Sequence, residues 1–169
     1  SLHDALPICL LVSETVPSKL HDDEALVAWI RERQARRERV IFTSGCFDVL
    51  HVGHVRSLRA ARALGDRLVI GLNSDESVRA LKGEGRPYFA QDERAEVLSA
   101  LDPVDAIVIV PEHTMDRVLD QLRPDVFAKG TDYTVETIPE RETVLGYGGE
   151  LAIVGDPKTR GSRQFRVVR

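Results

Sequence analysis

Apolar runs alternate with polar and helix-periodic stretches along most of the chain. The runs at 40–43, 67–72, 105–110, 126–128 and 151–154 are rich in Val, Ile and Leu, so we predict that they are strands. These runs are nearly continuous instead of alternating between apolar and polar positions, which is typical of strands covered on both faces. The pattern therefore predicts a buried parallel sheet.

Between the runs, apolar residues spaced three and four apart predict helices. The predicted helices cover residues 22–38, 55–64, 91–101, 114–122 and 141–146, and a further helix is expected to begin at Asn73-Ser74-Asp75 with Ser74 as its N-cap. Asp22 and Asp23 begin the first helix, where a side-chain cap and a negative charge are favourable, and Gly65 is suited to end the second. Strands that alternate with helices predict an α/β fold, a Rossmann-like three-layer α/β/α arrangement with a parallel five-stranded sheet.

The most informative polar stretch follows the first predicted strand, at residues 43–54, which read Thr-Ser-Gly-Cys-Phe-Asp-Val-Leu-His-Val-Gly-His. In open α/β sheets, ligands bind at the carboxyl ends of the strands. Gly45 removes a side chain where a backbone must approach another group closely. His51 and His54 are three apart and are predicted to share one face of a first helical turn, where free amide groups also favour anions. The stretch therefore predicts a phosphate site.

Two further loops carry cations after predicted elements. Residues 81–87 (Leu-Lys-Gly-Glu-Gly-Arg-Pro) form a Gly-rich loop whose Lys82 and Arg86 can neutralise phosphate charge. Lys129 and Gly130 follow the fourth predicted strand directly. We call residues 43–54 the histidine turn. Because the carboxyl ends of parallel strands meet at one edge of a sheet, we expect the two loops and the histidine turn to lie close together and to bind one polyanion.

Composition narrows the class of protein. The 169 residues are 43% hydrophobic and 30% charged, which fits one globular domain, and the formal net charge of −4 argues against a general nucleic-acid binder. Two cysteines, Cys9 and Cys46, form neither a disulfide framework nor a zinc pattern, as expected for a reducing cytoplasm. No apolar run approaches the roughly 20 residues of a membrane span, and no signal peptide is expected.

The beginning of the chain has a different character from the rest. Residues 1–8 (Ser-Leu-His-Asp-Ala-Leu-Pro-Ile) match what a sequencing adaptor encodes when it is read in frame. We therefore expect residues 1–20 to be an artefact followed by a linker, and residues 21–169 to form the functional domain.

The stretch from Gly45 to His54 matches the signature Gly-x-Phe-Asp-x-x-His-x-Gly-His at every fixed position, and it resembles the cytidylyltransferase-like nucleotidyltransferases. The resemblance extends over about residues 40–156 and implies that ATP is a substrate, with Mg²⁺ held at Asp48. It also implies three sets of site residues: catalytic His51, His54, Lys82 and Arg94; nucleotide-binding Ser44, Gly45, Cys46, Phe47, Asp48, Gly53, Lys129, Gly130, Asp132, Thr159 and Ser162; and substrate-binding Asn73, Asp75 and Arg86.

Within that family, the chain most resembles the heptose 1-phosphate adenylyltransferases. The shared motifs include Asn-Ser-Asp, Leu-Lys-Gly-x-x-Arg-Pro, Lys-Gly-x-Asp-Tyr and the pair Gly148-Gly149. This resemblance implies transfer of AMP from ATP to heptose 1-phosphate with release of pyrophosphate, for ADP-heptose and lipopolysaccharide. The chain departs from the pattern at Thr131, where Gly is usual, and at 158–164, where only Thr159 and Ser162 supply hydroxyl groups.

Several alternatives stay open from the sequence. One is a CTP-dependent polyol-phosphate cytidylyltransferase or a flavin adenylyltransferase, and another is a nucleotide-binding module with weak turnover. The resemblance implies a homodimer and a pairing or fusion with a sugar kinase. A dinucleotide-dependent dehydrogenase is disfavoured, because the first predicted strand is not followed by Gly-x-Gly-x-x-Gly.

Overall fold

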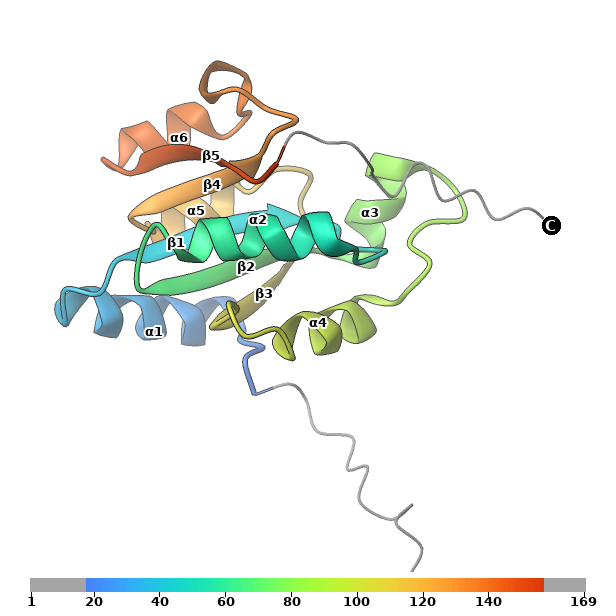
Figure 1. Ribbon diagram of the computed structural model, residues 1–169, viewed down its shortest axis with the longest axis horizontal. Coiled ribbons are helices and arrows are strands. Elements are labelled where there is room, and N and C mark those ends of the chain that lie inside the picture. Colours follow the sequence, from blue (N-terminus) through green and yellow to red (C-terminus); the bar gives the residue numbers. More distant parts are fainter. Residues whose placement is uncertain (1–17, 157–169) are drawn as a thin grey trace, which may run out of the picture.

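The computed structural model of the chain describes residues 18–156 (Figure 1). The expectations for residues 1–17 and for Thr159 and Ser162 lie outside the described residues. Among the described residues, no helix has both the length and the apolar character needed to cross a bilayer.

The centre of the fold is the predicted five-stranded sheet. Its strands are β1 (Val40–Gly45), β2 (Arg67–Asn73), β3 (Ala106–Val110), β4 (Val126–Gly130) and β5 (Glu150–Val154). They lie in the order β3-β2-β1-β4-β5, and all neighbouring pairs are parallel. The α/β, Rossmann-like prediction is therefore confirmed. β1 runs two residues further than predicted, because Ser44 and Gly45 continue the ladder with Gly71 and Leu72.

Six α-helices of the described residues surround this sheet (Figure 1). They are α1 (Asp23–Ala35), α2 (Val52–Arg62), α3 (Asp75–Lys82), α4 (Gln91–Ser99), α5 (Asp116–Leu122) and α6 (Arg141–Gly146), with a short 3-10 helix η2 (Val135–Thr137). Asp22 caps α1, since its side chain accepts from the Ala25 amide at 2.8 Å. α1 ends earlier than predicted, because Arg37 takes a left-handed φ of 63°.

Side-chain alternation along the strands divides the core into two layers. Phe42 of β1 and Phe127 of β4 face a cluster that contains residues of α1, α5 and α6. Ile41 of β1 and Ala128 of β4 face a second cluster with residues of α2 and α4. β1 to β4 are thus mainly buried on both faces, which explains their continuous apolar runs, whereas the edge strand β5 is only partly buried.

The direction in which the sheet is built reverses between β1 and β4. After β1 the chain builds outward through β2 to β3, and it then crosses back to β4 and builds outward through β5. The connection after β1 leads to α2 on one face, whereas the connection after β4 leads to α6 on the other. In open α/β sheets such a reversal of strand order is the usual place for a ligand.

Candidate functional site

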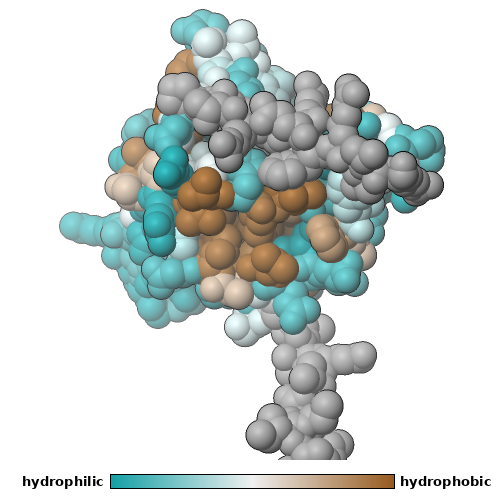
Figure 2. Space-filling model, turned by 45° about the vertical axis from the view of Figure 1, so that its right-hand side comes forward, coloured by the Kyte–Doolittle hydropathy of each residue, from teal (hydrophilic) through white to brown (hydrophobic). Residues whose placement is uncertain are grey.

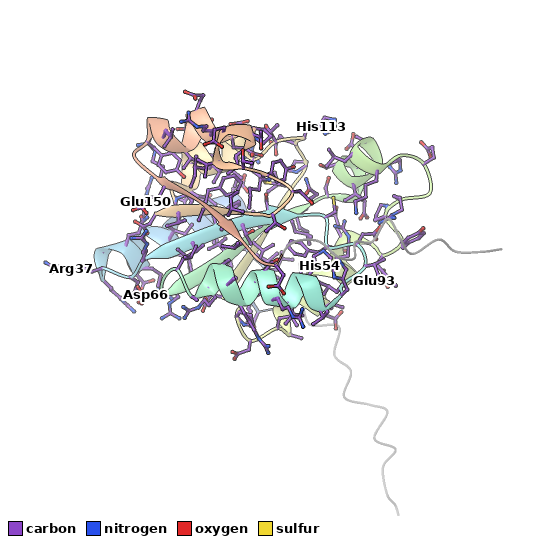
Figure 3. All side chains as sticks on the ribbon, turned by 45° about the horizontal axis from the view of Figure 1, so that its top comes forward. Arg37, His54, Asp66, Glu93, His113 and Glu150 are labelled. Atoms are coloured by element: carbon purple, nitrogen blue, oxygen red, sulfur yellow. The ribbon has the colours of Figure 1, made fainter. Side chains whose placement is uncertain are left out.

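The histidine turn connects β1 to α2 at the carboxyl edge of the sheet, and its two rings lie together. His51 is the N-cap of α2, and its Nδ1 accepts a hydrogen bond from the Gly53 amide at 3.1 Å. His54 returns the contact, since its Nδ1 accepts from the His51 amide at 3.3 Å. The ring centroids are 3.9 Å apart. Figure 3 shows His54 at the end of α2 remote from Arg37 and Asp66.

This capping arrangement determines where each imidazole carries its proton. A nitrogen that accepts a hydrogen bond has its lone pair engaged, so in the neutral rings of His51 and His54 the hydrogen is assigned to Nε2. Each ring can then offer an Nε2–H donor while Nδ1 caps the helix. The Gly53 and His51 amides donate to these rings, and the predicted phosphate contacts of the turn stay a prediction.

Glycines allow this close packing in the turn. A Cβ at Gly53 would lie 2.9 Å from Cε1 of the His51 ring, which is too close for the ring to keep its cap. A Cβ at Gly45 would lie 3.1 Å from the Phe47 ring. Phe47 itself has a left-handed φ of 45°, and its ring centroid lies 5.4 Å from that of His54. Phe47 therefore packs between Gly45 and the His54 ring.

Asp48, predicted to hold Mg²⁺, makes several contacts within the protein. Its Oδ1 accepts from the Tyr88 and Phe89 amides at 2.7 and 3.2 Å, and its Oδ2 pairs with Arg86 Nε. The side chain has no exposed surface. Within residues 18–156, no group of three or more His, Cys, Asp or Glu residues could hold a metal ion. Asp48 therefore binds the 83–90 loop to the histidine turn, and its contact with Mg²⁺ stays a prediction.

Arg86, predicted to bind substrate, is the charged partner of Asp48. Its guanidinium carbon lies 4.3 Å from the centroid of the Tyr88 ring. Nη2 is buried and, in the described part of the chain, has no hydrogen-bond partner. The Arg86 guanidinium thus binds Asp48 and packs on Tyr88 within the loop, while its Nη2 has no hydrogen-bond partner in the described part of the chain.

Arg94 also makes contacts inside the protein, and its contact with the leaving phosphates stays a prediction. The side chain is 1% exposed, and its Nη2 pairs with the Asp75 carboxylate at 2.7 Å. Its other nitrogens donate to the carbonyl oxygens of Cys46, Asn73 and Phe89 at 2.6, 2.8 and 2.9 Å. Arg94 therefore ties together the loop after β1, the loop after β2 and the 83–90 loop.

Asn73, predicted to contact the acceptor, is 5% exposed. Its Nδ2 donates to Ser77 Oγ at 3.0 Å, and its Oδ1 accepts from Cys46 Sγ at 3.8 Å. Through these contacts Asn73 joins the end of β2 to α3 and to Cys46, and its contact with the acceptor stays a prediction. Asp75 at the start of α3 is more accessible than Asn73, because 36% of its side-chain surface is exposed.

Lys129 is the penultimate residue of β4, which runs two residues further than the predicted strand 126–128. Its Nζ donates to Ser44 Oγ at 3.0 Å, so it joins the neighbouring ends of β4 and β1. Gly130 follows it, and no atom would lie within 4 Å of a Cβ there, whereas Asp132 and Lys82 are exposed. The edge thus gathers the histidine pair, Ser44 and Lys129.

Glu140 is a polar residue of this region that the sequence did not reveal. Its Oε2 lies 3.8 Å from Lys129 Nζ, and the residue is 3% exposed. In the sequence, Pro139 and Glu140 precede a short helix and have the pattern of an exposed helix start. No local signal indicates that this carboxylate is buried.

Apolar surface borders the histidine turn. Val52 at the start of α2 is 62% exposed, and Phe89 in the 83–90 loop is 51% exposed. Figure 2, which brings the right-hand side of Figure 1 forward, shows apolar side chains gathered in one patch on that face. A phosphate at the turn would therefore be flanked by both donors and apolar groups.

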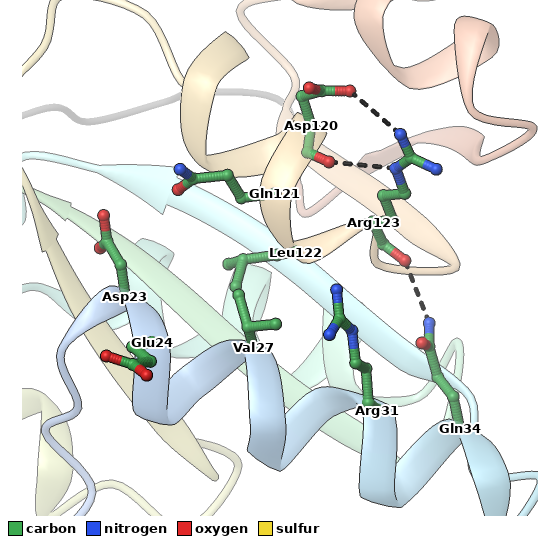
Figure 4. Close-up of a pocket in the computed structure, with 9 residues that line it drawn as sticks. All are labelled: Asp23, Glu24, Val27, Arg31, Gln34, Asp120, Gln121, Leu122 and Arg123. Carbon is green, nitrogen blue, oxygen red and sulfur yellow. Dashed lines mark hydrogen bonds and ion pairs between the residues drawn. The ribbon is translucent and has the colours of Figure 1, made fainter.

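A groove of about 670 Å³ lies between α1 and α5 (Figure 4). It is lined by charged and polar side chains, among them Asp23, Arg31 and Asp120, and by Val27. None of its lining residues belongs to the predicted site, and the helices that form it lie on one face of the sheet instead of at its carboxyl edge. We therefore assign the chemistry to the edge.

The Cys46 thiol is expected to react about tenfold more slowly with iodoacetamide than free glutathione near pH 8. Burial raises the pKa of this thiol, and the Asp48 charge adds to the effect, while Lys82 and Arg94 oppose it. Fewer thiolates are then present than in an ordinary cysteine. Mass spectrometry of the Cys46 peptide measures the rate, and urea should restore it. A rate equal to that of glutathione in the folded protein would contradict the burial of this thiol.

Comparison with known proteins agrees with this geometry. The cytidylyltransferase-like family matches residues 42–155. The chain is 50% identical over 137 residues to the bifunctional protein HldE of Pelobacter propionicus, and 48% identical over 132 residues to that of Pseudomonas paraeruginosa. These matches cover 81% and 78% of this chain, and the chain spans 28% of each relative.

Solved structures support the fold. A lipopolysaccharide core biosynthesis protein from Thermoplasma volcanium superposes with a TM-score of 0.63 at 24% identity, over 72% of this chain and 99% of that one. The family match covers most of the described residues and includes the histidine turn, Lys82, Arg94 and Lys129. The chain therefore belongs to the cytidylyltransferase-like family and is a nucleotidyltransferase.

Proposed function

We propose that this chain transfers AMP from ATP to heptose 1-phosphate, with release of pyrophosphate, to form ADP-heptose for lipopolysaccharide. The observation that carries the proposal is the His51–His54 pair, whose ring centroids lie 3.9 Å apart and whose Nδ1 atoms accept the capping hydrogen bonds at the start of α2. The motifs shared with heptose 1-phosphate adenylyltransferases and the identity to the HldE proteins support the acceptor class.

The reaction needs little covalent chemistry from the protein. A phosphate oxygen of the acceptor forms a bond to the α-phosphorus of ATP, and the bond from that phosphorus to the pyrophosphate oxygen breaks. The attacking oxygen is already anionic, so no strong base is required. Catalysis then depends on positioning the reactants and on neutralising charge.

The histidines suit this task because neutral Nε2–H groups can donate to the phosphate oxygens on which charge accumulates. Lys129 at the end of β4 and Lys82 at the end of α3 supply positive charge for the acceptor and the nucleotide. We assign the remaining nucleotide contacts to the carboxyl ends of β1 and β4 and the loops that follow them. The residues are Ser44, Gly45, Cys46, Phe47, Gly53, Gly130 and Asp132. Asp75, with its partly exposed carboxylate, is the remaining candidate for acceptor contact.

Three polar residues act in this proposal by holding loops in place. Asp48 and Arg86 bind the 83–90 loop, and Arg94 joins that loop to the ends of β1 and β2. Their carboxylate and guanidinium groups are already bound within the protein. Mg²⁺ accordingly has no carboxylate cage among the described residues, and we derive no step through it.

The setting of the reaction is part of the proposal. Because the matched HldE proteins are described as bifunctional and are much longer than this chain, we infer that the domain works beside a sugar kinase. Such a kinase would supply the phosphorylated acceptor. A cytoplasmic location and a homodimer complete the proposal.

A pyrophosphate-release assay tests the function. The chain is incubated with ATP or CTP and with heptose 1-phosphate, glycerol 3-phosphate or flavin mononucleotide. Release is expected only for ATP with heptose 1-phosphate. Release with CTP and glycerol 3-phosphate, or with flavin mononucleotide, would replace the acceptor assignment, and calorimetric binding of ATP without release in any combination would reduce the chain to a nucleotide-binding module.

A further inference from the structure

Glu140 is a buried carboxylate with one oxygen engaged and the other facing a lysine. It immediately precedes α6, and its Oε1 accepts from the Met115 amide at 3.2 Å. Its Oε2 has no hydrogen-bond partner in the described part of the chain and lies 3.8 Å from Lys129 Nζ. A buried carboxylate of this kind is costly unless a cation compensates it.

Lys129 is a buried cation that in turn needs a negative partner, since its side chain is only 11% exposed. The ammonium nitrogen lies 5.1 Å from the ring centroids of both Phe127 and Tyr133. It donates to Ser44 Oγ at 3.0 Å. Burial disfavours the charged form of an ammonium group, and a negative group close to it favours that form.

We propose that Glu140 is a positioning residue that keeps the Lys129 ammonium charged and directed toward Ser44 at the carboxyl edge of the sheet. The inference rests on the proposed function, in which Lys129 meets the phosphates. Glu140 itself does not contact substrate in this proposal, because its carboxylate lies behind Lys129 and is bound to the Met115 amide.

The electrostatics agree with this role. Burial lowers the pKa of Lys129, and the negative charge of Glu140 opposes that change, with a smaller contribution from Cys46. Burial and the Glu140 charge raise the pKa of Tyr133, so this neighbour stays neutral. Removing the Glu140 charge removes the main group that raises the pKa of Lys129, which must then lose its proton at a lower pH.

Glu140→Gln tests the role with little change of shape. The Gln Oε1 can still accept from the Met115 amide, while an uncharged amide replaces the carboxylate facing Lys129. The titration of Lys129, followed by NMR of its ¹³C-labelled Cε, is expected to move down by about one pH unit. The basic limb of the pH dependence of pyrophosphate release should move with it, with about a tenfold loss of kcat on that limb.

Glu142→Gln is the matched control, because it removes a carboxylate from the same helix at a side chain that is 89% exposed. It should leave both the titration and the pH profile unchanged. Glu140→Asp keeps the charge, so its Lys129 titration should lie nearer the wild type, and it serves as the readout if Glu140→Gln does not fold. An Asp variant that titrates a full unit lower would contradict the role of the charge.

The two proposals fail separately. If Lys129 titrates at the same pH in wild type and Glu140→Gln, the positioning role is wrong even though the enzyme is active. If the wild-type chain releases no pyrophosphate with any triphosphate, the proposed function fails, while the NMR titration still reports whether Glu140 controls the charge of Lys129.

Discussion

Replacing His54 with asparagine is expected to lower kcat about a hundredfold while leaving the fold intact. The side-chain oxygen of asparagine can take the place of Nδ1 and accept from the His51 amide, so the cap on α2 survives. The Nε2–H donor is lost, and each preorganised donor to a developing charge contributes about 3 kcal/mol to lowering the barrier. Single-turnover pyrophosphate release and thermal unfolding measure the two effects separately.

His54→Ala removes both the cap and the donor. It should show the same loss of rate as His54→Asn, and in addition about 1 kcal/mol less stability. His113→Asn is the control, because it changes an exposed histidine outside the capping pair and should leave rate and stability as they are. A rate loss below about threefold in His54→Asn would remove His54 from the groups that stabilise the transition state.

Asp48→Ala is expected to reduce the free energy of unfolding by about 3 kcal/mol. The change leaves the Arg86 guanidinium without its counter-charge, at a side chain that is only 13% exposed, and it frees the Tyr88 and Phe89 amides. Losing one partner of a largely buried ion pair costs more than the pair contributes, because the other charge stays desolvated. Urea unfolding measures this loss.

Asp48→Ala also separates a loop-binding role from a metal-binding role. If Asp48 only binds the loop, the Mg²⁺ concentration that half-saturates pyrophosphate release stays at the wild-type value. Asp102→Ala is the control for stability, since this exposed aspartate should change the free energy of unfolding by less than about 0.5 kcal/mol. An unchanged stability together with a raised Mg²⁺ requirement would restore Asp48 as a metal ligand.

Much of the fold was accessible from local patterns. Continuous apolar runs identified all five strands, and helix-length segments between them required parallel pairing, because parallel strands need long crossovers. The same reasoning placed the histidine turn and Lys129 at the carboxyl edge. The length of β1 was misjudged, since Ser44 and Gly45 are polar or small and join the sheet only through pairing with β2.

The site was predictable only in part, and the charged residues show why. By itself, the sequence determined which residue types reach the carboxyl edge, because strand periodicity and turn positions are local properties. The tertiary structure decided which of them are bound to other parts of the chain. Asp48 and Arg94 were predicted to meet metal and phosphate, yet their charges are bound to the 83–90 loop and to Asp75. Glu140 reaches Lys129 from the start of α6. A charge binds whatever partner the folded chain brings within a few ångströms, and that partner comes from another element, which no local pattern specifies.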